Sequence, residues 1–133
     1  MAVPPGQKPR ILVVDDERSL REMLSIVLGR EGYDVTTAED VGSALDQIRR
    51  GPLPDLLISD LRMPDGSGVD VVAALREHQP ETQSVVVTIH DDDDHLFPAL
   101  QAGAFGYILK EQARELIIEQ LQRMAQGEPP LSP

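Results

Sequence analysis

The sequence predicts an α/β fold built on a doubly wound, five-stranded parallel sheet, and three observations support this prediction. Short apolar runs rich in Val, Ile and Leu alternate with segments whose apolar residues recur at helical spacing. The runs are continuously apolar, which indicates strands covered by helices on both faces of the sheet. The chain of 133 residues has no internal repeat and suits one domain. Right-handed crossovers then favour the strand order 2-1-3-4-5.

Five short segments are expected to be strands, and all of them except residues 33–37 are mainly apolar. They are residues 11–14, 33–37, 56–59, 84–88 and 106–109. Five apolar stripes at helical spacing predict the helices. The stripes contain Leu20, Met23, Leu24, Val27 and Leu28; Val41, Ala44, Leu45 and Ile48; Val69, Val72, Ala73 and Leu75; residues 96–102; and Ala113, Leu116, Ile117, Leu121 and Met124.

The fourth helical segment contains Pro98 and follows an acidic run, residues 91–94. Because a proline in a helix interior costs about 3 kcal/mol, we expect this helix to begin late, near Leu96 or Phe97, or to be kinked. The acidic run is interpreted as a solvated loop whose charge favours the helix N-terminus. An extra metal site or a repulsive gate is the alternative.

The composition narrows the class of partner. The formal net charge of −11 argues against binding of nucleic acid or anionic membrane by this chain itself. The chain has no Cys, which excludes disulfides, thiol catalysis and cysteine metal sites and agrees with a cytoplasmic location. No apolar run approaches the roughly 18 residues of a membrane span, so we expect no membrane association. Residues 1–8 are rich in Pro and are expected to be a disordered lead-in.

Polar residues follow four of the predicted strands. Asp15 and Asp16 end the first strand, Asp60 the third, Thr88 the fourth and Lys110 the fifth. The carboxyl ends of the strands in such a sheet meet at one edge, where these folds bind ligands. Two carboxylates about 4 Å apart repel by roughly 4 kcal/mol at an effective dielectric of 20, so three of them raise a pKa or recruit a cation. A site with only oxygen ligands favours magnesium.

Each of these residues also has a simpler interpretation. One of Asp15 and Asp16 would cap the first helix, since Asp16 precedes Glu17. Asp60 would cap the next helix or start a turn, Lys110 would be a solvated surface residue, and Thr88 a simple strand former. These interpretations do not explain why all five residues arrive at the same edge. A carboxylate nucleophile beside a divalent cation and an ammonium suits phosphoryl transfer that forms an aspartyl phosphate.

The product of that reaction is expected to persist, because no residue is clearly placed as a general base to hydrolyse it. His90 and His95 lie near the pocket edge, where each is better interpreted as a loop or helix-surface residue. A persistent phosphate suits a switch better than a rapid hydrolase. We therefore expect the chain not to be an enzyme, apart from assisting its own phosphotransfer and slow autodephosphorylation.

Together these residues resemble the receiver domain of bacterial two-component response regulators, over residues 9–126. The motifs that carry the resemblance are residues 11–16, Asp60-Leu61-Arg62-Met63-Pro64 with Gly68, Thr88, and residues 103–110. The resemblance implies that Asp60 accepts a phosphoryl group from a phosphohistidine on a sensor histidine kinase. It implies a magnesium site formed by Asp15, Asp16, Asp60 and the backbone carbonyl of Arg62. It also implies phosphate contacts from Thr88, the Ile89 backbone amide and Lys110, and a rotamer change of Tyr107 that follows Thr88 in a shift between two packings.

The residues after the fifth strand indicate a subfamily. Glu111 stands where many receivers have Pro after the Lys, which resembles regulators of the NarL/LuxR (FixJ) type with a C-terminal helix-turn-helix domain. Residues 127–133 resemble the start of the linker to such a domain, so DNA binding is expected only through a domain absent from this chain. A homodimer is expected on phosphorylation, with Ile118 of the last helix as a candidate surface residue. A stand-alone receiver is the alternative.

Two rival functions are compatible with parts of the sequence. Ile89 follows Thr88 where the family usually has a small residue, and its bulk would narrow access to the phosphate site. Together with Pro98, it keeps open an interaction module with the receiver fold whose output needs no phosphorylation. A magnesium-dependent phosphatase or nucleotide-binding enzyme would need a glycine-rich phosphate loop or an acid two residues after Asp60. The chain has neither, and position 62 is Arg.

Overall fold

A single parallel sheet forms the centre of the molecule. The computed structural model describes residues 8–88, 93–110 and 114–125. The five strands are β1 (Arg10–Val14), β2 (Asp34–Ala38), β3 (Leu56–Asp60), β6 (Gln83–Thr88) and β7 (Gly106–Leu109). They lie in the order β2-β1-β3-β6-β7, and each neighbouring pair is parallel. Counted along the chain, this is the predicted order 2-1-3-4-5.

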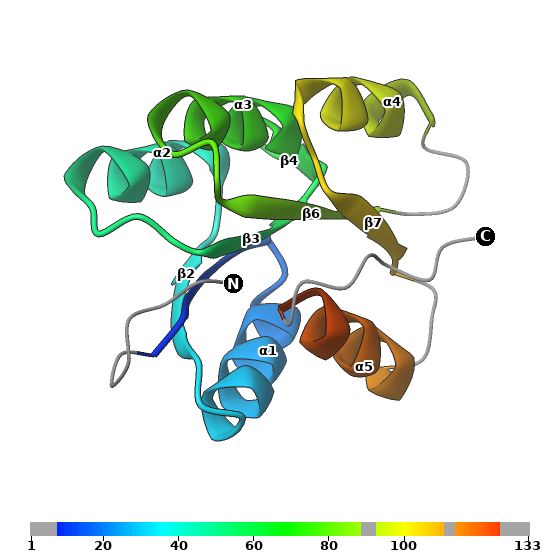
Figure 1. The fold of residues 1–133 in the computed structure, drawn as a ribbon. Coiled ribbons are helices and arrows are strands. Elements are labelled where there is room, and N and C mark those ends of the chain that lie inside the picture. Colours follow the sequence, from blue (N-terminus) through cyan, green and yellow to red (C-terminus); the bar gives the residue numbers. More distant parts are fainter. Residues whose placement is uncertain (1–7, 89–92, 111–113, 126–133) are drawn as a thin grey trace.

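Within the described residues, helices cover both faces of the sheet (Figure 1). Helices α1 (Arg18–Arg30) and α5 (Arg114–Ala125) lie on one face. Helices α2 (Val41–Arg50), α3 (Gly68–His78) and α4 (Asp93–Ala102) lie on the other. The doubly wound α/β fold expected from the apolar pattern is therefore confirmed.

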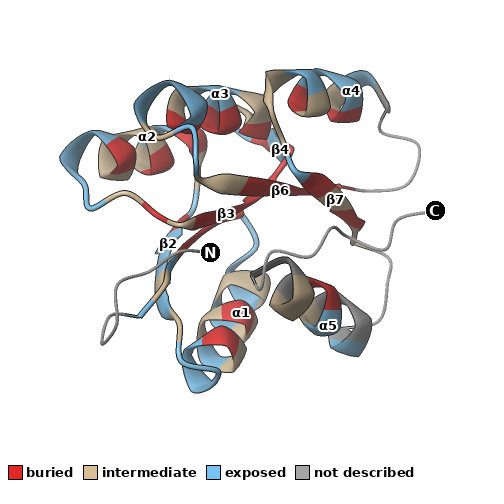
Figure 2. Cartoon of the chain, viewed as in Figure 1, coloured by how far each residue is buried: buried red, intermediate tan, exposed pale blue. Residues whose placement is uncertain are grey.

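Each face of the sheet has its own aliphatic core, because successive side chains of a strand point to opposite faces. On the α2–α3–α4 face, Leu12 and Leu57 pack with Ala44, Val72 and other residues of one buried cluster. On the α1 face, Ile11 and Ile58 pack with Leu24 of a second cluster. Figure 2 shows the central strands β1, β3 and β6 largely buried, whereas the edge strand β2 is largely exposed. The continuous apolar strands of the sequence correspond to this double coverage.

A small antiparallel hairpin follows β3 and was not expected from the sequence. It consists of β4 (Arg62–Met63) and β5 (Gly66–Ser67), with Arg62 opposite Ser67 and Met63 opposite Gly66. Each strand has only two residues, too few to show a period in the sequence. The hairpin carries the chain from the end of β3 to the start of α3.

Helix α4 corrects one expectation. It begins at Asp93, so the predicted late start near Leu96 or Phe97 was wrong, whereas the alternative of a kink at Pro98, which lies inside the helix, stays a prediction. A proline removes one backbone donor, whose helical partner would be the carbonyl of residue 94. Asp94 is exposed in the first turn of the helix, where water can donate to that carbonyl instead. Acidic residues also stabilise a helix N-terminus, which helps the helix extend to Asp93.

The C-terminus of α4 yields a testable prediction. Gly103 follows the helix with a φ of +116°, and a side chain at this position would collide with Arg76 of α3. Because non-glycine residues rarely adopt such a φ, we expect Gly103→Ala to lower the free energy of unfolding by about 1–2 kcal/mol. Urea denaturation measures the change. The control is Gly29→Ala in α1, which has open space around it and should stabilise the protein; equal destabilisation by both variants would contradict the prediction.

Several expectations lie outside the described residues. They concern the lead-in over most of residues 1–8, the residue Ile89, His90, most of the acidic run, the residue Glu111 and the linker over residues 127–133. In the part of the chain that the structure describes, none of the helices has the length and apolar character needed to cross a membrane.

Candidate functional site

The predicted polar residues meet at the carboxyl ends of the strands. Asp15 follows β1, Asp60 is the last residue of β3, Thr88 is the last residue of β6, and Lys110 follows β7. Backbone hydrogen bonds continue the parallel ladder past the strand ends, from Asp15 N to the Ala38 carbonyl (3.1 Å) and from Lys110 N to the Thr88 carbonyl (2.8 Å). The sheet therefore fixes the backbone of each of these positions.

Three carboxylates form one cluster at this edge. One oxygen each of Asp15, Asp16 and Asp60 lies within 4.8 Å of the others. Asp15 is 1% exposed and Asp60 is 7% exposed, whereas Asp16 is exposed to solvent. Cations, protons or hydrogen-bond donors are needed to stabilise such a cluster of acids against mutual repulsion.

Lys110 supplies one cation to the cluster. Its Nζ donates a hydrogen bond to Asp60 Oδ2 at 2.9 Å. The same Nζ lies 3.3 Å from Asp15 Oδ2, but without the geometry of a hydrogen bond. Asp15 Oδ2 is buried and accepts no hydrogen bond from the described residues. This buried oxygen thus has an ion pair with Lys110 but no well-aligned hydrogen bond, which leaves it undersatisfied for a buried acceptor.

The electrostatics of the cluster shift three pKa values. Burial, together with the charge of Asp60, raises the pKa of Asp15 from its ordinary 3.8 to about 6, against the opposing hydrogen bond from Glu17. Burial likewise raises the pKa of Asp60, and Lys110 only partly offsets it. Burial disfavours the charged form of Lys110, but its contacts with Asp60 and Asp15 prevail, so the pKa of Lys110 lies above its ordinary value. The metal-free site is therefore short of positive charge.

The donor set fits a magnesium ion. Three carboxylates and one ammonium leave about two uncompensated negative charges. An octahedral magnesium ion holds ligands at about 2.1 Å, so two of its ligands lie up to about 4.2 Å apart. The carboxylate oxygens, within 4.8 Å of one another, need only a small adjustment to reach such an ion. The buried Asp15 Oδ2 without a hydrogen bond is the oxygen that a cation would satisfy.

Two backbone contacts hold the Asp15 loop and correct the helix-cap interpretation. Asp15 Oδ1 accepts a hydrogen bond from Glu17 N at 2.8 Å, and the N-cap of α1 is Glu17, which makes no side-chain cap. Neither Asp15 nor Asp16 is therefore the N-cap residue, although the Asp15 side chain does accept the backbone donor of the N-cap residue itself. Arg21 of α1 donates from Nη1 to the Asp15 carbonyl at 2.7 Å. Sequence reasoning missed Arg21, because nothing in a helical stripe shows that a polar residue reaches back to the preceding loop.

A close approach of backbone fixes the chain around Asp60. Gly68 N donates to the Leu61 carbonyl at 2.9 Å, and Ser59 Oγ donates to the Asp60 carbonyl at 2.9 Å. A Cβ on Gly68 would collide with the Asp60 carbonyl oxygen. The N-cap of α3 is Ser67, which accepts from Val69 N, so the interpretation of Asp60 as a helix cap is wrong as well.

The structure places three further predicted site residues near this edge of the sheet. Thr88 is 3% exposed, and its backbone is paired with that of Lys110 at the same edge. Tyr107 lies within β7, half-buried against the core of the α2–α3–α4 face. Arg62 begins the hairpin, with its N at 3.4 Å from Asp60 Oδ1. The roles of these residues toward a phosphoryl group stay predictions, and Ile89 lies outside the described residues.

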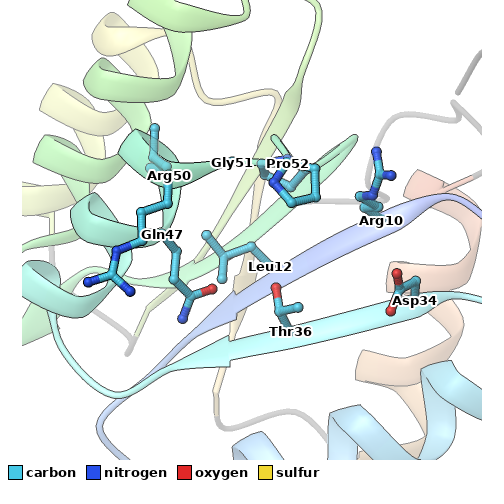
Figure 3. A pocket seen from close by; sticks show the side chains of 10 residues that line it. Arg10, Leu12, Asp34, Thr36, Gln47, Arg50, Gly51 and Pro52 are labelled. Atoms are coloured by element: carbon cyan, nitrogen blue, oxygen red, sulfur yellow. The ribbon is translucent and has the colours of Figure 1, made fainter.

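A separate hollow lies at the opposite end of the strands. It has a volume of about 150 Å³ and is lined by Arg10, Asp34, Gln47, Arg50 and Pro52 among others (Figure 3). Arg10 and Asp34 are the first residues of β1 and β2, so this hollow lies away from the acidic cluster at the carboxyl ends of the strands. It contains none of the predicted site residues, and the chemistry of the chain is therefore concentrated at the other edge.

Comparison with known proteins identifies relatives over nearly the whole chain. The family described as the response regulator receiver domain matches residues 11–122. The transcriptional regulatory protein NarL of Mycobacterium tuberculosis is 32% identical over all of this chain and 62% of its own length. The oxygen regulatory protein NreC of Staphylococcus haemolyticus is 36% identical over 90% of this chain and 56% of its own. The response regulator protein PilR of Pseudomonas aeruginosa is 37% identical over 86% of this chain but only 26% of its own.

Solved structures agree with the fold. A receiver domain protein described as CheY-like, from Methanospirillum hungatei, superposes with a TM-score of 0.82 at 26% identity, covering 91% of this chain and 96% of that one. The signal receiver domain of the response regulator NarL from Mycobacterium tuberculosis gives a TM-score of 0.75 at 34% identity, covering 92% and 99%. The chain thus matches isolated receiver domains over almost their full length, whereas it spans between about a quarter and two thirds of the curated relatives named above.

Proposed function

The chain belongs to the response regulator receiver domain family, and from this membership we infer that it is a phosphorylation switch whose phosphoacceptor is Asp60. The phosphoryl donor would be a phosphohistidine on a sensor histidine kinase. The observation that best supports this role is the position of Asp60, which is buried at the strand end between the Lys110 ammonium and two further carboxylates. That arrangement offers a nucleophile and opposite charges for the phosphoryl oxygens in one place.

The phosphotransfer would proceed by in-line attack. A carboxylate oxygen of Asp60 forms a bond to phosphorus while the bond from phosphorus to the donor breaks, and the donor leaves with the electron pair. Lys110 holds Asp60 in place through its 2.9 Å hydrogen bond and faces the negative charge of the phosphoryl group. Asp15, Asp16, Asp60 and the Arg62 carbonyl would hold magnesium, which supplies positive charge to the phosphoryl oxygens.

The switch would follow from the new charge at the strand ends. Thr88 and the backbone amide of Ile89 would contact the phosphoryl group, and Tyr107 would follow Thr88 in a shift between two packings. The position of Thr88 beside Lys110 supports the first contact. A phosphorylated homodimer is part of the same proposal, although Ile118 is half-buried in α5 and therefore offers less surface than expected.

The output would be control of transcription. NarL and PilR carry the words transcriptional regulatory or response regulator in their names, and both are longer than this chain. We infer a regulator of the NarL/LuxR type, whose DNA-binding domain lies outside this chain. The relation to NarL and NreC supports that subfamily, whereas the comparable identity to PilR shows that the receiver sequence alone is similar to more than one kind of regulator.

Intact-mass measurement tests the function. The protein is incubated with a small acyl phosphate and magnesium, alongside Asp60→Asn and the control Asp70→Asn, whose carboxylate is exposed in the first turn of α3. We expect one phosphoryl adduct on the wild type and on Asp70→Asn, and none on Asp60→Asn. An adduct that persists in Asp60→Asn would place the phosphoacceptor elsewhere. No adduct on folded wild type would favour a phosphorylation-independent interaction module.

A further inference from the structure

Asp65 makes two contacts that none of the roles above explains. It lies in the turn of the β4–β5 hairpin, and its two carboxylate oxygens accept hydrogen bonds from Val41 N and Gly42 N, both at 2.9 Å. The donors are the first two residues of α2, more than twenty positions away in the sequence. These two hydrogen bonds lower the pKa of the exposed Asp65 carboxyl below its ordinary value. Asp65 is therefore charged throughout the physiological range.

Helix α2 already has a cap of its own, so Asp65 has a different task. Asp40 is the N-cap residue, and its side chain accepts from Ser43 N at 2.7 Å. Asp65 takes the two remaining donors of the first turn and adds a negative charge at the positive end of the helix. A local cap fixes only the helix, whereas a carboxylate from a distant hairpin fixes the hairpin to the helix.

The two segments that Asp65 joins lead to opposite sides of the acidic site. The hairpin begins two residues after Asp60, and it contains Arg62, whose N lies 3.4 Å from Asp60 Oδ1. Helix α2 follows β2, whose last residue Ala38 accepts the hydrogen bond from Asp15 N. Met63 of the hairpin and Val41 of α2 also share the buried core of this face. The contacts of Asp65 thus bridge the segment after Asp60 and the segment that supports Asp15.

We propose that Asp65 is a positioning residue for the magnesium and phosphoryl site, a clasp that holds the β4–β5 hairpin against the N-terminus of α2. The clasp keeps Asp60 and the Arg62 backbone at a fixed distance from Asp15, so that the oxygen ligands are arranged before the cation arrives. The proposal rests on the proposed function, since it assigns Asp65 to the same site. Outer groups that orient metal ligands typically contribute 10–100-fold in metal affinity.

The test measures phosphorylation by a small acyl phosphate as a function of magnesium concentration, for the wild type, Asp65→Ala and Asp40→Ala. We expect Asp65→Ala to raise the magnesium concentration at half-maximal rate by about tenfold, with the maximal rate recovered at saturating magnesium. Asp40→Ala removes the local cap of α2 and leaves the clasp in place. It should lower thermal stability by a helix-cap effect and leave the magnesium dependence close to that of the wild type.

Each other outcome has a definite meaning. If Asp65→Ala keeps the wild-type magnesium dependence, or if Asp40→Ala shifts it equally, the clasp is overturned and Asp65 is only a cap for α2. If Asp65→Ala does not fold, Asp65→Asn, which keeps one acceptor oxygen, is measured instead and should give a smaller shift of the same sign. Absence of any wild-type adduct would refute the proposed function. Calorimetric titration of the same variants with magnesium would then still show whether Asp65 contributes to magnesium affinity.

Discussion

Gly68→Ala is expected to lower the free energy of unfolding by about 3 kcal/mol and to weaken magnesium binding. The Cβ of an alanine at this position would collide with the Asp60 carbonyl oxygen, and Ser59 Oγ would also be closer than a Cβ tolerates. Both neighbours belong to the buried strand β3, which has no room to move away. Overpacking of this kind typically costs about 1–3 kcal/mol, and a contact with backbone falls at the upper end.

A matched control distinguishes the effect of Gly68→Ala from the ordinary effect of alanine on helix propensity. Gly42 occupies the first turn of α2 as Gly68 occupies that of α3, but the nearest atom to a Cβ there is Asp65 Oδ2 at 3.5 Å, an ordinary contact. Gly42→Ala is expected to be neutral or slightly stabilising. Urea denaturation with and without magnesium measures both variants. A Gly68→Ala protein as stable as Gly42→Ala would show that β3 and α3 can separate without cost.

The main architecture was predictable because it depends on patterns that a sequence displays directly. Buried parallel strands need continuous apolar residues, and runs such as Leu56 to Ile58 and Val85 to Val87 have few other uses. The strand order then followed from the handedness of crossovers. The assembly of Asp15, Asp60 and Lys110 was predictable for the same reason, because a parallel sheet brings the carboxyl ends of its strands to one edge.

The features that sequence reasoning missed depend on contacts between segments distant in the chain. Asp65 lies between Pro64 and Gly66, and such a triplet indicates a turn whatever the side chain of its middle residue contacts. Arg21 is one of several polar residues of α1, and its hydrogen bond to the Asp15 carbonyl depends on where α1 packs. The start of α4 was misjudged because the cost of Pro98 was assigned to a helix interior, whereas the carbonyl it leaves unpaired lies in an exposed first turn.

The metal-free protein is expected to lose stability as pH rises from about 4 to about 6. Asp15 has a pKa of about 6 in the folded state against 3.8 ordinarily, and the pKa of Asp60 is raised as well. Between these values the unfolded chain has released the Asp15 proton while the folded protein still binds it, so the unfolding free energy falls with pH. For Asp15 the loss is about 3 kcal/mol above pH 6. The pKa of Asp65 is shifted downward, so its stabilisation is present above about pH 4 and lost in stronger acid.

Asp15→Asn is therefore expected to stabilise the metal-free protein by about 2 kcal/mol at pH 7 while abolishing the response to magnesium. The amide removes the buried negative charge, keeps an oxygen for Glu17 N and gives up the contact with Lys110. Chemical denaturation at pH 5 and pH 7, with and without magnesium, measures both effects. Wild type should gain more from magnesium at pH 7 than at pH 5, because the cation competes with protons for the same carboxylates.

The control for this experiment is Asp34→Asn. Asp34 is an exposed carboxylate on β2 at the opposite end of the sheet, so the variant should change neither the stability at pH 7 nor the response to magnesium. If Asp15→Asn instead lowers stability at pH 7, the ion pair with Lys110 outweighs the cost of burial, and the site is stable without a cation. If it raises stability as expected, the acidic cluster is a strained arrangement that the fold keeps for its ligand. The free energy released when a cation binds then offsets the cost of gathering the three carboxylates, and the phosphoryl group would act on a site that is already charge-balanced.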